Sequence, residues 1–142
     1  MSLLIRLVSN IGDRSLDDGF IAIVKNACDG YLDDIRGEVL TLAGGFGLLV
    51  EDLGDGGDIG TLRSALGADA EMRSIDGEIL LEVSKARVAE IARNLPDVVD
   101  HLGDGSISLR DDELSLQAVR SLMQFYDSAA RAGHSIVIYP MA

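Results

Sequence analysis

The stretch AEMRSIDGEILLEV, residues 70–83, carries the clearest hairpin signal in this chain. Asp76 and Gly77 stand between two strand-like runs, and both residue types tolerate the left-handed backbone of a two-residue type I′ turn. Ile75 and Ile79 flank the turn with side chains that favour strands. The stretch therefore predicts two antiparallel strands joined by a tight turn.

Two helical patterns follow the hairpin. Residues 84–95 begin at a natural N-cap, Ser84, and we expect Pro96 to stop this helix because proline cannot donate the next helical hydrogen bond; the stretch PDVVDHL (96–102) could add one further turn. Residues 111–133 have acids at their start and Gly133 as C-cap. The apolar residues of this second helix recur at helical spacing, which predicts a buried stripe of Leu114, Ala118, Leu122, Phe125 and Ala129.

The remaining patterns are shorter. Runs of apolar and β-branched residues predict strands, and capped runs of helical period predict helices. The expected strands are 3–9, 37–42, 46–51, 105–109 and 134–140, the last ended by Pro140, and the expected helices are 15–28 and 58–67. The stretch CDGYLDD (28–34) is interpreted as the turn after the first helix.

The order of these elements predicts the fold class. It runs β-α-β-β-α-β and then β-α-β-α-β, and the first six elements match the ferredoxin-like βαββαβ order. We therefore expect a single α+β domain over residues 1–142, with a mainly antiparallel sheet and helices packed on it. A chain of 142 residues has the usual size of one domain and folds without a disulfide or a metal.

The net charge of −12, from 24 acidic and 12 basic residues, limits the partners of this chain. Such a surface repels phosphate backbones and anionic lipids, so we expect neither nucleic-acid binding nor membrane binding. It favours fast capture of a basic protein. With one cysteine, no long apolar segment and no signal-peptide pattern, the expected location is the cytoplasm.

Two Asp/Gly-rich stretches raise the question of cation binding: EDLGDGGDIG (51–60) and DHLGDGSISLRD (100–111). The first stretch lacks the oxygen ligands that a calcium loop needs at positions 3, 5 and 12, and the second, though better, has Leu102 at position 3 and lacks the long Glu at position 12. The first stretch also lacks the lysine of a phosphate-binding loop. We interpret it as a solvated turn, and we expect no metal and no cofactor.

No catalytic constellation is apparent in the sequence. His134 follows Gly133, where a histidine favours the negative end of the preceding helix, and His101 is interpreted as a solvated loop histidine. Few residues remain that act as nucleophile or base at neutral pH. We therefore predict no catalytic residues and no enzyme.

Two hypotheses of function remain. The first is a non-enzymatic protein-binding protein, such as an immunity protein or inhibitor that neutralises a basic, nuclease-type toxin. The alternative is a small-molecule-sensing regulatory module of ferredoxin-like type, with the loop AGGFG (43–47) near its ligand. Neither hypothesis fixes the oligomeric state. For the first, we expect the contacts to lie in the acidic loops 29–34 and 51–58, together with three acids further along the chain: Asp29, Tyr31, Asp33, Asp34, Asp52, Asp55, Asp58, and then Asp97, Asp100 and Asp104.

Overall fold

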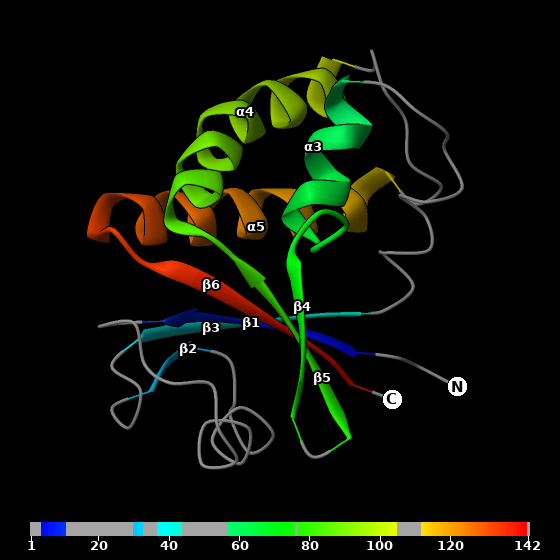
Figure 1. Ribbon diagram of the computed structural model, residues 1–142. Coiled ribbons are helices and arrows are strands. Elements are labelled where there is room, and N and C mark those ends of the chain that lie inside the picture. Colours follow the sequence, from blue (N-terminus) through cyan, green and yellow to red (C-terminus); the bar gives the residue numbers. More distant parts are fainter. Residues whose placement is uncertain are drawn as a thin grey trace.

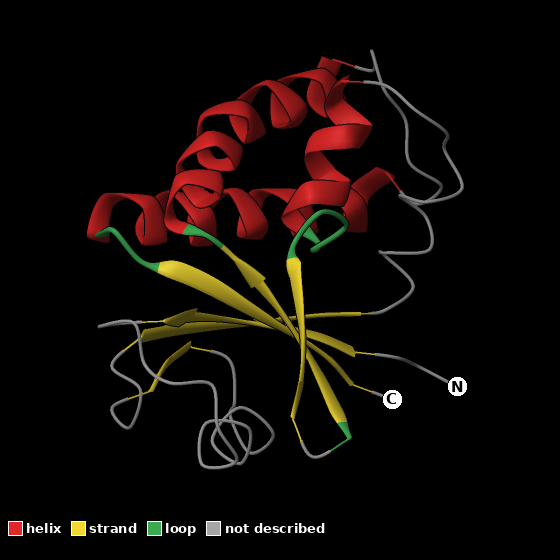
Figure 2. Cartoon of the chain, in the orientation of Figure 1, coloured by secondary structure: helices red, strands yellow, loops and turns green. Residues whose placement is uncertain are grey.

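The structure, a computed structural model, describes residues 4–10, 30–32, 37–43, 57–75, 77–104 and 112–141. Within these ranges six strands form one sheet and three helices lie on one of its faces, as Figures 1 and 2 show. The predicted α+β class is therefore confirmed. The strands are β1 (Leu4–Asn10), β2 (Gly30–Leu32), β3 (Gly37–Ala43), β4 (Glu71–Ile75), β5 (Glu78–Val83) and β6 (Ser135–Met141), and the helices are α3 (Gly57–Ala65), α4 (Lys85–Asp104) and α5 (Asp112–Ala132).

The strands of the sheet follow the order β2-β3-β1-β6-β5-β4, and every described pairing is antiparallel. The last strand in the chain, β6, lies between β1 and β5. Ile138 of β6 is opposite Leu7 on one side and Leu81 on the other, so these three residues share one face of the sheet. The C-terminal strand thus joins the N-terminal strands β1–β3 to the β4–β5 hairpin.

The β4–β5 hairpin is confirmed. Ile75 of β4 is opposite Glu78 of β5, which leaves two residues for the turn. Gly77 has a φ of +79°, the left-handed conformation that the turn requires.

The main hydrophobic core lies between the sheet and the three helices. The strands contribute one row of side chains, and each described helix contributes its apolar stripe. The buried members are Leu7, Val83, Ile136 and Ile138 from strands, Leu62 and Ala65 from α3, Val88, Ile91, Leu95 and Val98 from α4, and Val119, Leu122, Phe125, Tyr126 and Ala129 from α5.

The opposite face of the sheet is buried as well. Val8, Leu80, Val137 and Tyr139 are buried there, while the register places Leu7, Ile136 and Ile138 on the helical face. Burial on both faces explains why β6 reads as an unbroken apolar run instead of an alternating one.

The prediction that Pro96 stops the helix is wrong. Helix α4 continues from Lys85 to Asp104 with Pro96 inside it, and Figure 1 shows it as an arc. A proline within a helix costs about 3 kcal/mol because one hydrogen bond is lost and the ring crowds the preceding turn. Beyond the proline, however, Val98 is fully buried and Val99 and Leu102 pack against the core. Their burial contributes a similar amount, at roughly 2 kcal/mol for each fully buried side chain.

Helix α5 and its end are confirmed. It spans Asp112–Ala132, and Gly133 follows with a φ of +73°. The Gly133 N–H donates to Ala130 O at 3.2 Å and the His134 N–H to Ala129 O at 2.9 Å, which is a Schellman motif. In the predicted stripe, Leu122, Phe125 and Ala129 are buried and Ala118 is partly buried, whereas the side chain of Leu114 lies outside the described residues.

Two further expectations need correction. Tyr31 lies in β2, opposite Glu38, because Gly30–Leu32 pairs with β3 instead of forming a turn. Strand β6 continues past Pro140 to Met141, with Pro140 opposite Ile5.

Several expected elements and motifs lie outside the described residues: the helix 15–28, the strands 46–51 and 105–109, the loop 43–47 beyond Ala43, and residues 51–56 of the first Asp/Gly-rich stretch. The ferredoxin-like order of the first half depends on two of these elements and therefore stays a prediction. The same holds for the single-domain boundary at 1–142.

Tyr126 fixes the end of α3 to α5. Its hydroxyl donates to Ala65 O at 2.7 Å in the core, which satisfies a carbonyl that the ending helix leaves free. Burial raises the pKa of Tyr126, and the negative charge of Asp69 raises it further. The phenol therefore stays protonated and keeps donating.

We expect Tyr126→Phe to lower the free energy of unfolding by about 1–3 kcal/mol, because a buried carbonyl loses its partner. Urea denaturation at neutral pH measures this loss. An unfolded tyrosine ionises near pH ~10. Because the folded pKa is raised, wild-type stability from this group is complete below that pH and falls as the pH rises above it. The loss of stability at high pH that comes from the ionisation of Tyr126 should be absent from the phenylalanine variant. Equal stability of the two proteins at neutral pH would show that the bond contributes nothing.

Candidate functional site

Three of the expected contact residues lie together on one face of α4. Asp97, Asp100 and Asp104 are all exposed. Their spacing of i, i+3 and i+7 puts them on one side of a helix. We call these three residues the acidic face. All three lie beyond the expected helix 84–95, and the structure places them in a helix because α4 continues through Pro96.

The acidic face is poorly placed for helix stability. Asp104 lies in the last turn of α4, where the aligned peptide dipoles create partial negative charge, and Asp97 and Asp100 lie just before that turn. Acids there cost stability, and like charges three or four residues apart repel one another. In contrast, α4 has no acid in its first turn, where one would stabilise it. The helix dipole and the spacing of these like charges therefore give no reason for a row of three acids here.

The other expected contact residues are not brought together by the described structure. Asp58 lies in the first turn of α3 instead of a loop, and Tyr31 lies in the edge strand β2. The side chains of both are outside the described residues, and so is all of Asp29, Asp33, Asp34, Asp52 and Asp55. His101, expected in a loop, lies half-buried in the last turn of α4. The second Asp/Gly-rich stretch, 100–111, thus begins inside a helix.

A polar cluster on the same helix was not predicted from the sequence. Arg87 of α4 donates through Nε to Asp69 Oδ2 at 3.1 Å and through Nη2 to the same oxygen. Nη2 also donates to Ser64 Oγ of α3 at 2.9 Å, and Nη1 pairs with Glu90 Oε2 at 2.8 Å. Ser64 in turn donates to Asp69 Oδ2 at 3.3 Å. The cluster connects α3, the turn after it and α4.

The charges of this cluster leave a surplus of one negative charge. One guanidinium faces two carboxylates, those of Glu90 and Asp69. The bond to Glu90, and then the bond to Asp69, raise the pKa of Arg87, so it remains a cation. Most of its N–H groups are already used within the cluster. A phosphate or carboxylate ligand would therefore find few free donors and two repelling acids.

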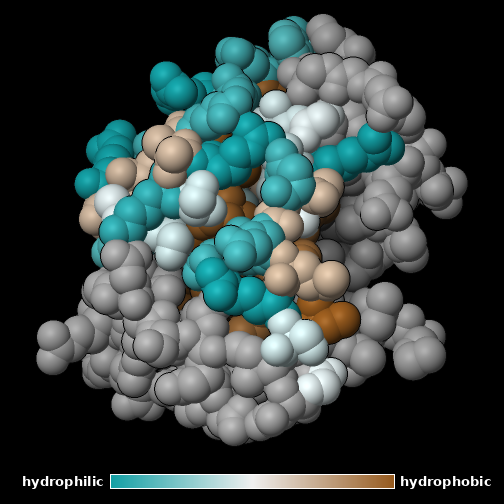
Figure 3. All heavy atoms as spheres, in the orientation of Figure 1, coloured by the Kyte–Doolittle hydropathy of each residue, from teal (hydrophilic) through white to brown (hydrophobic). Residues whose placement is uncertain are grey.

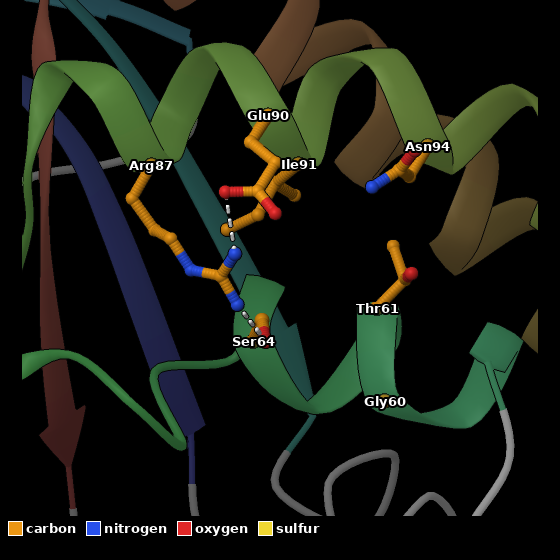
Figure 4. Close-up of a pocket in the computed structure, with 7 residues that line it drawn as sticks. All are labelled: Gly60, Thr61, Ser64, Arg87, Glu90, Ile91 and Asn94. Atoms are coloured by element: carbon orange, nitrogen blue, oxygen red, sulfur yellow. Dashed lines mark hydrogen bonds and ion pairs between the residues drawn. The ribbon is translucent and has the colours of Figure 1, made fainter.

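The cluster borders a pocket between α3 and α4 with a volume of about 260 Å³. Figure 4 shows Thr61 and Asn94 facing each other across it, with Gly60 at its edge and the Arg87–Glu90 pair at one end. Ile91 supplies an apolar wall. Figure 3 shows hydrophilic side chains gathered over the helical layer around this region. Glu90, Asn94 and Asp97 follow one another at i, i+4 and i+7, so the pocket continues into the acidic face.

Only part of this site carries a signal in the sequence. The pair Arg87 and Glu90 has the i, i+3 spacing of a helical ion pair. Ser64 and Asp69 reach Arg87 from 23 and 18 residues away, which no local pattern reveals. Their contact depends on the packing of α3 on α4.

The part of the chain that the structure describes contains no group of three or more His, Cys, Asp or Glu residues placed to hold a metal ion. None of its helices is long and apolar enough to cross a membrane. Comparison with protein families, curated proteins and solved structures gives no match to this chain.

Proposed function

We propose that this chain is a non-enzymatic protein-binding protein whose acidic face on α4 docks a basic protein. The observation that carries the proposal is the position of Asp97, Asp100 and Asp104. They are exposed and aligned on one helix face, at spacings where like charges repel one another. Like charges held together in this way at a cost in stability are typical of functional surfaces.

The net charge of the whole chain supports the same partner. At −12, the protein attracts cationic surfaces over long range and repels anionic ones. A protein that handles nucleic acid carries a basic surface, because it must neutralise phosphates. The proposed partner class is therefore a basic, nuclease-type toxin, and the proposed role is that of an immunity or inhibitor protein in the cytoplasm.

The salt dependence of capture tests this proposal. We would immobilise the protein, expose it to a lysate of its source cells at low ionic strength and elute with rising salt. The expected result is one stoichiometric basic protein whose affinity falls about tenfold or more as salt reaches roughly half-molar, where screening shortens the reach of charge to about 4 Å. Capture that is insensitive to salt would contradict the proposal.

A small-molecule-sensing module of ferredoxin-like type is the second candidate, and the pocket between α3 and α4 favours it. At about 260 Å³ the pocket is smaller than the usual range for drug-sized ligands. The net negative charge of the Arg87 cluster beside the pocket also disfavours nucleotides and free amino-acid carboxylates. A rise in melting temperature with a nucleotide or an amino acid would favour this candidate over protein binding.

A further inference from the structure

We infer that the pocket between α3 and α4 receives one arginine side chain of the basic partner. This inference rests on the proposed function and extends it, because it names the recognition element beside the acidic face.

The size of the pocket suits one long side chain. Its volume of about 260 Å³ is below that of sites for whole drug-sized molecules. Two helices form its walls, with Gly60 and Thr61 on α3 and Asn94 on α4. A β-carbon built on Gly60 would meet nothing within 4 Å, so open space extends to the backbone of α3.

The charge of the pocket selects a cation. Arg87 and Glu90 balance each other in the pocket wall, and Asp69, which pairs with Arg87 from outside the lining, gives the whole cluster one net negative charge. Glu90 is half-exposed, and its carboxylate offers about four acceptor positions, of which the Arg87 pair uses one. The acidic face continues from Glu90 towards Asp97 along α4, so approaching cations are drawn to the same place.

The lining favours a guanidinium over an ammonium. A guanidinium is planar and weakly hydrated, and it donates a fork of parallel N–H groups that fits a carboxylate. Glu90 supplies the carboxylate, Asn94 supplies an amide oxygen nearby, and Ile91 gives an apolar wall for the methylene stem. A compact, strongly hydrated lysine ammonium would bind less tightly here, because it cannot form the paired hydrogen bonds that a guanidinium makes with a carboxylate.

A titration followed by amide NMR signals tests the inference. The probe is N-acetyl-arginine amide, which lacks a carboxylate, and the matched control probe is N-acetyl-citrulline amide, which has the same shape without charge. We expect the arginine probe to shift the signals of Thr61, Ser64 and Asn94 with a Kd of roughly 1–10 mM, as befits one side chain. The citrulline probe should bind at least tenfold more weakly.

Two variants and a control locate the binding. Gly60→Met adds a side chain where space is open, and it improves helix propensity, so the protein should fold. It should weaken arginine binding about tenfold or more by filling the pocket, and Glu90→Gln should weaken it about fivefold by removing the surplus charge. Gly103→Met makes the same replacement in the exposed last turn of α4, away from the pocket, and should leave binding unchanged.

The outcomes separate this inference from the proposed function. Equal shifts from both probes, no shifts at all, or arginine binding that survives Gly60→Met would overturn the arginine pocket. Salt-sensitive capture of a basic protein in that case would leave the proposed function standing. Arginine binding at the pocket without capture of any basic protein would support the pocket and count against the proposed function.

Discussion

Gly67→Ala is expected to lower the free energy of unfolding by about 2–3 kcal/mol, from two separate effects. Gly67 ends α3 with a φ of +96°, where a side chain is strained. Its N–H donates to Ser64 O, and the next N–H, of Ala68, donates to Arg63 O, so it holds a Schellman motif. An added β-carbon would also lie 2.8 Å from Leu81 Cδ1 and 3.2 Å from Ile138 Cδ1, in the core.

Gly133→Ala is the matched control for this prediction. Gly133 ends α5 in the same motif with a φ of +73°, but its β-carbon would meet nothing within 4 Å. The backbone effect alone should cost about 1 kcal/mol there. Urea denaturation of both variants separates the two effects. Equal losses at the two glycines would mean that the close approach of Gly67 to the sheet contributes nothing.

The parts of the fold that follow from short-range patterns were predictable. The Asp-Gly turn fixed the β4–β5 hairpin, and the stripe that ends at Gly133 fixed α5, because turn chemistry and helical period act over a few residues. The central place of β6 was not predictable, because strand pairing depends on contacts between the two ends of the chain.

Pro96 shows why a local rule misled the prediction of the site. The rule that proline ends a helix is sound for an isolated segment, but the burial of Val98, Val99 and Leu102 together offsets it here. Once α4 is continued, the spacing of Asp97, Asp100 and Asp104 reads directly as one helix face. The Arg87 cluster depends on the packing of α3 against α4, so it could not be predicted from local sequence patterns.

The triple change Asp97→Asn, Asp100→Asn and Asp104→Asn is expected to weaken binding of the basic partner roughly 100-fold. Each asparagine keeps the size and polarity of the side chain and removes only its charge. The same variant should be about 1 kcal/mol more stable, because three like charges that repel one another are gone, one of them in the last turn, where it opposes the helix dipole. For a chain of this size the melting temperature should rise by about 2–5 °C. Titration calorimetry and thermal unfolding measure the two effects.

The opposite signs of these two effects make the test specific. A change that merely damaged the fold would lower binding and stability together, whereas the loss of a docking face lowers binding alone. The control variant, Glu71→Gln, Glu82→Gln and Asp127→Asn, removes the same total charge from β4, β5 and α5. Long-range attraction falls equally in both variants, so the control should slow association but retain most of the affinity. If both variants bound equally well, net charge alone would account for capture and α4 would not be the docking face.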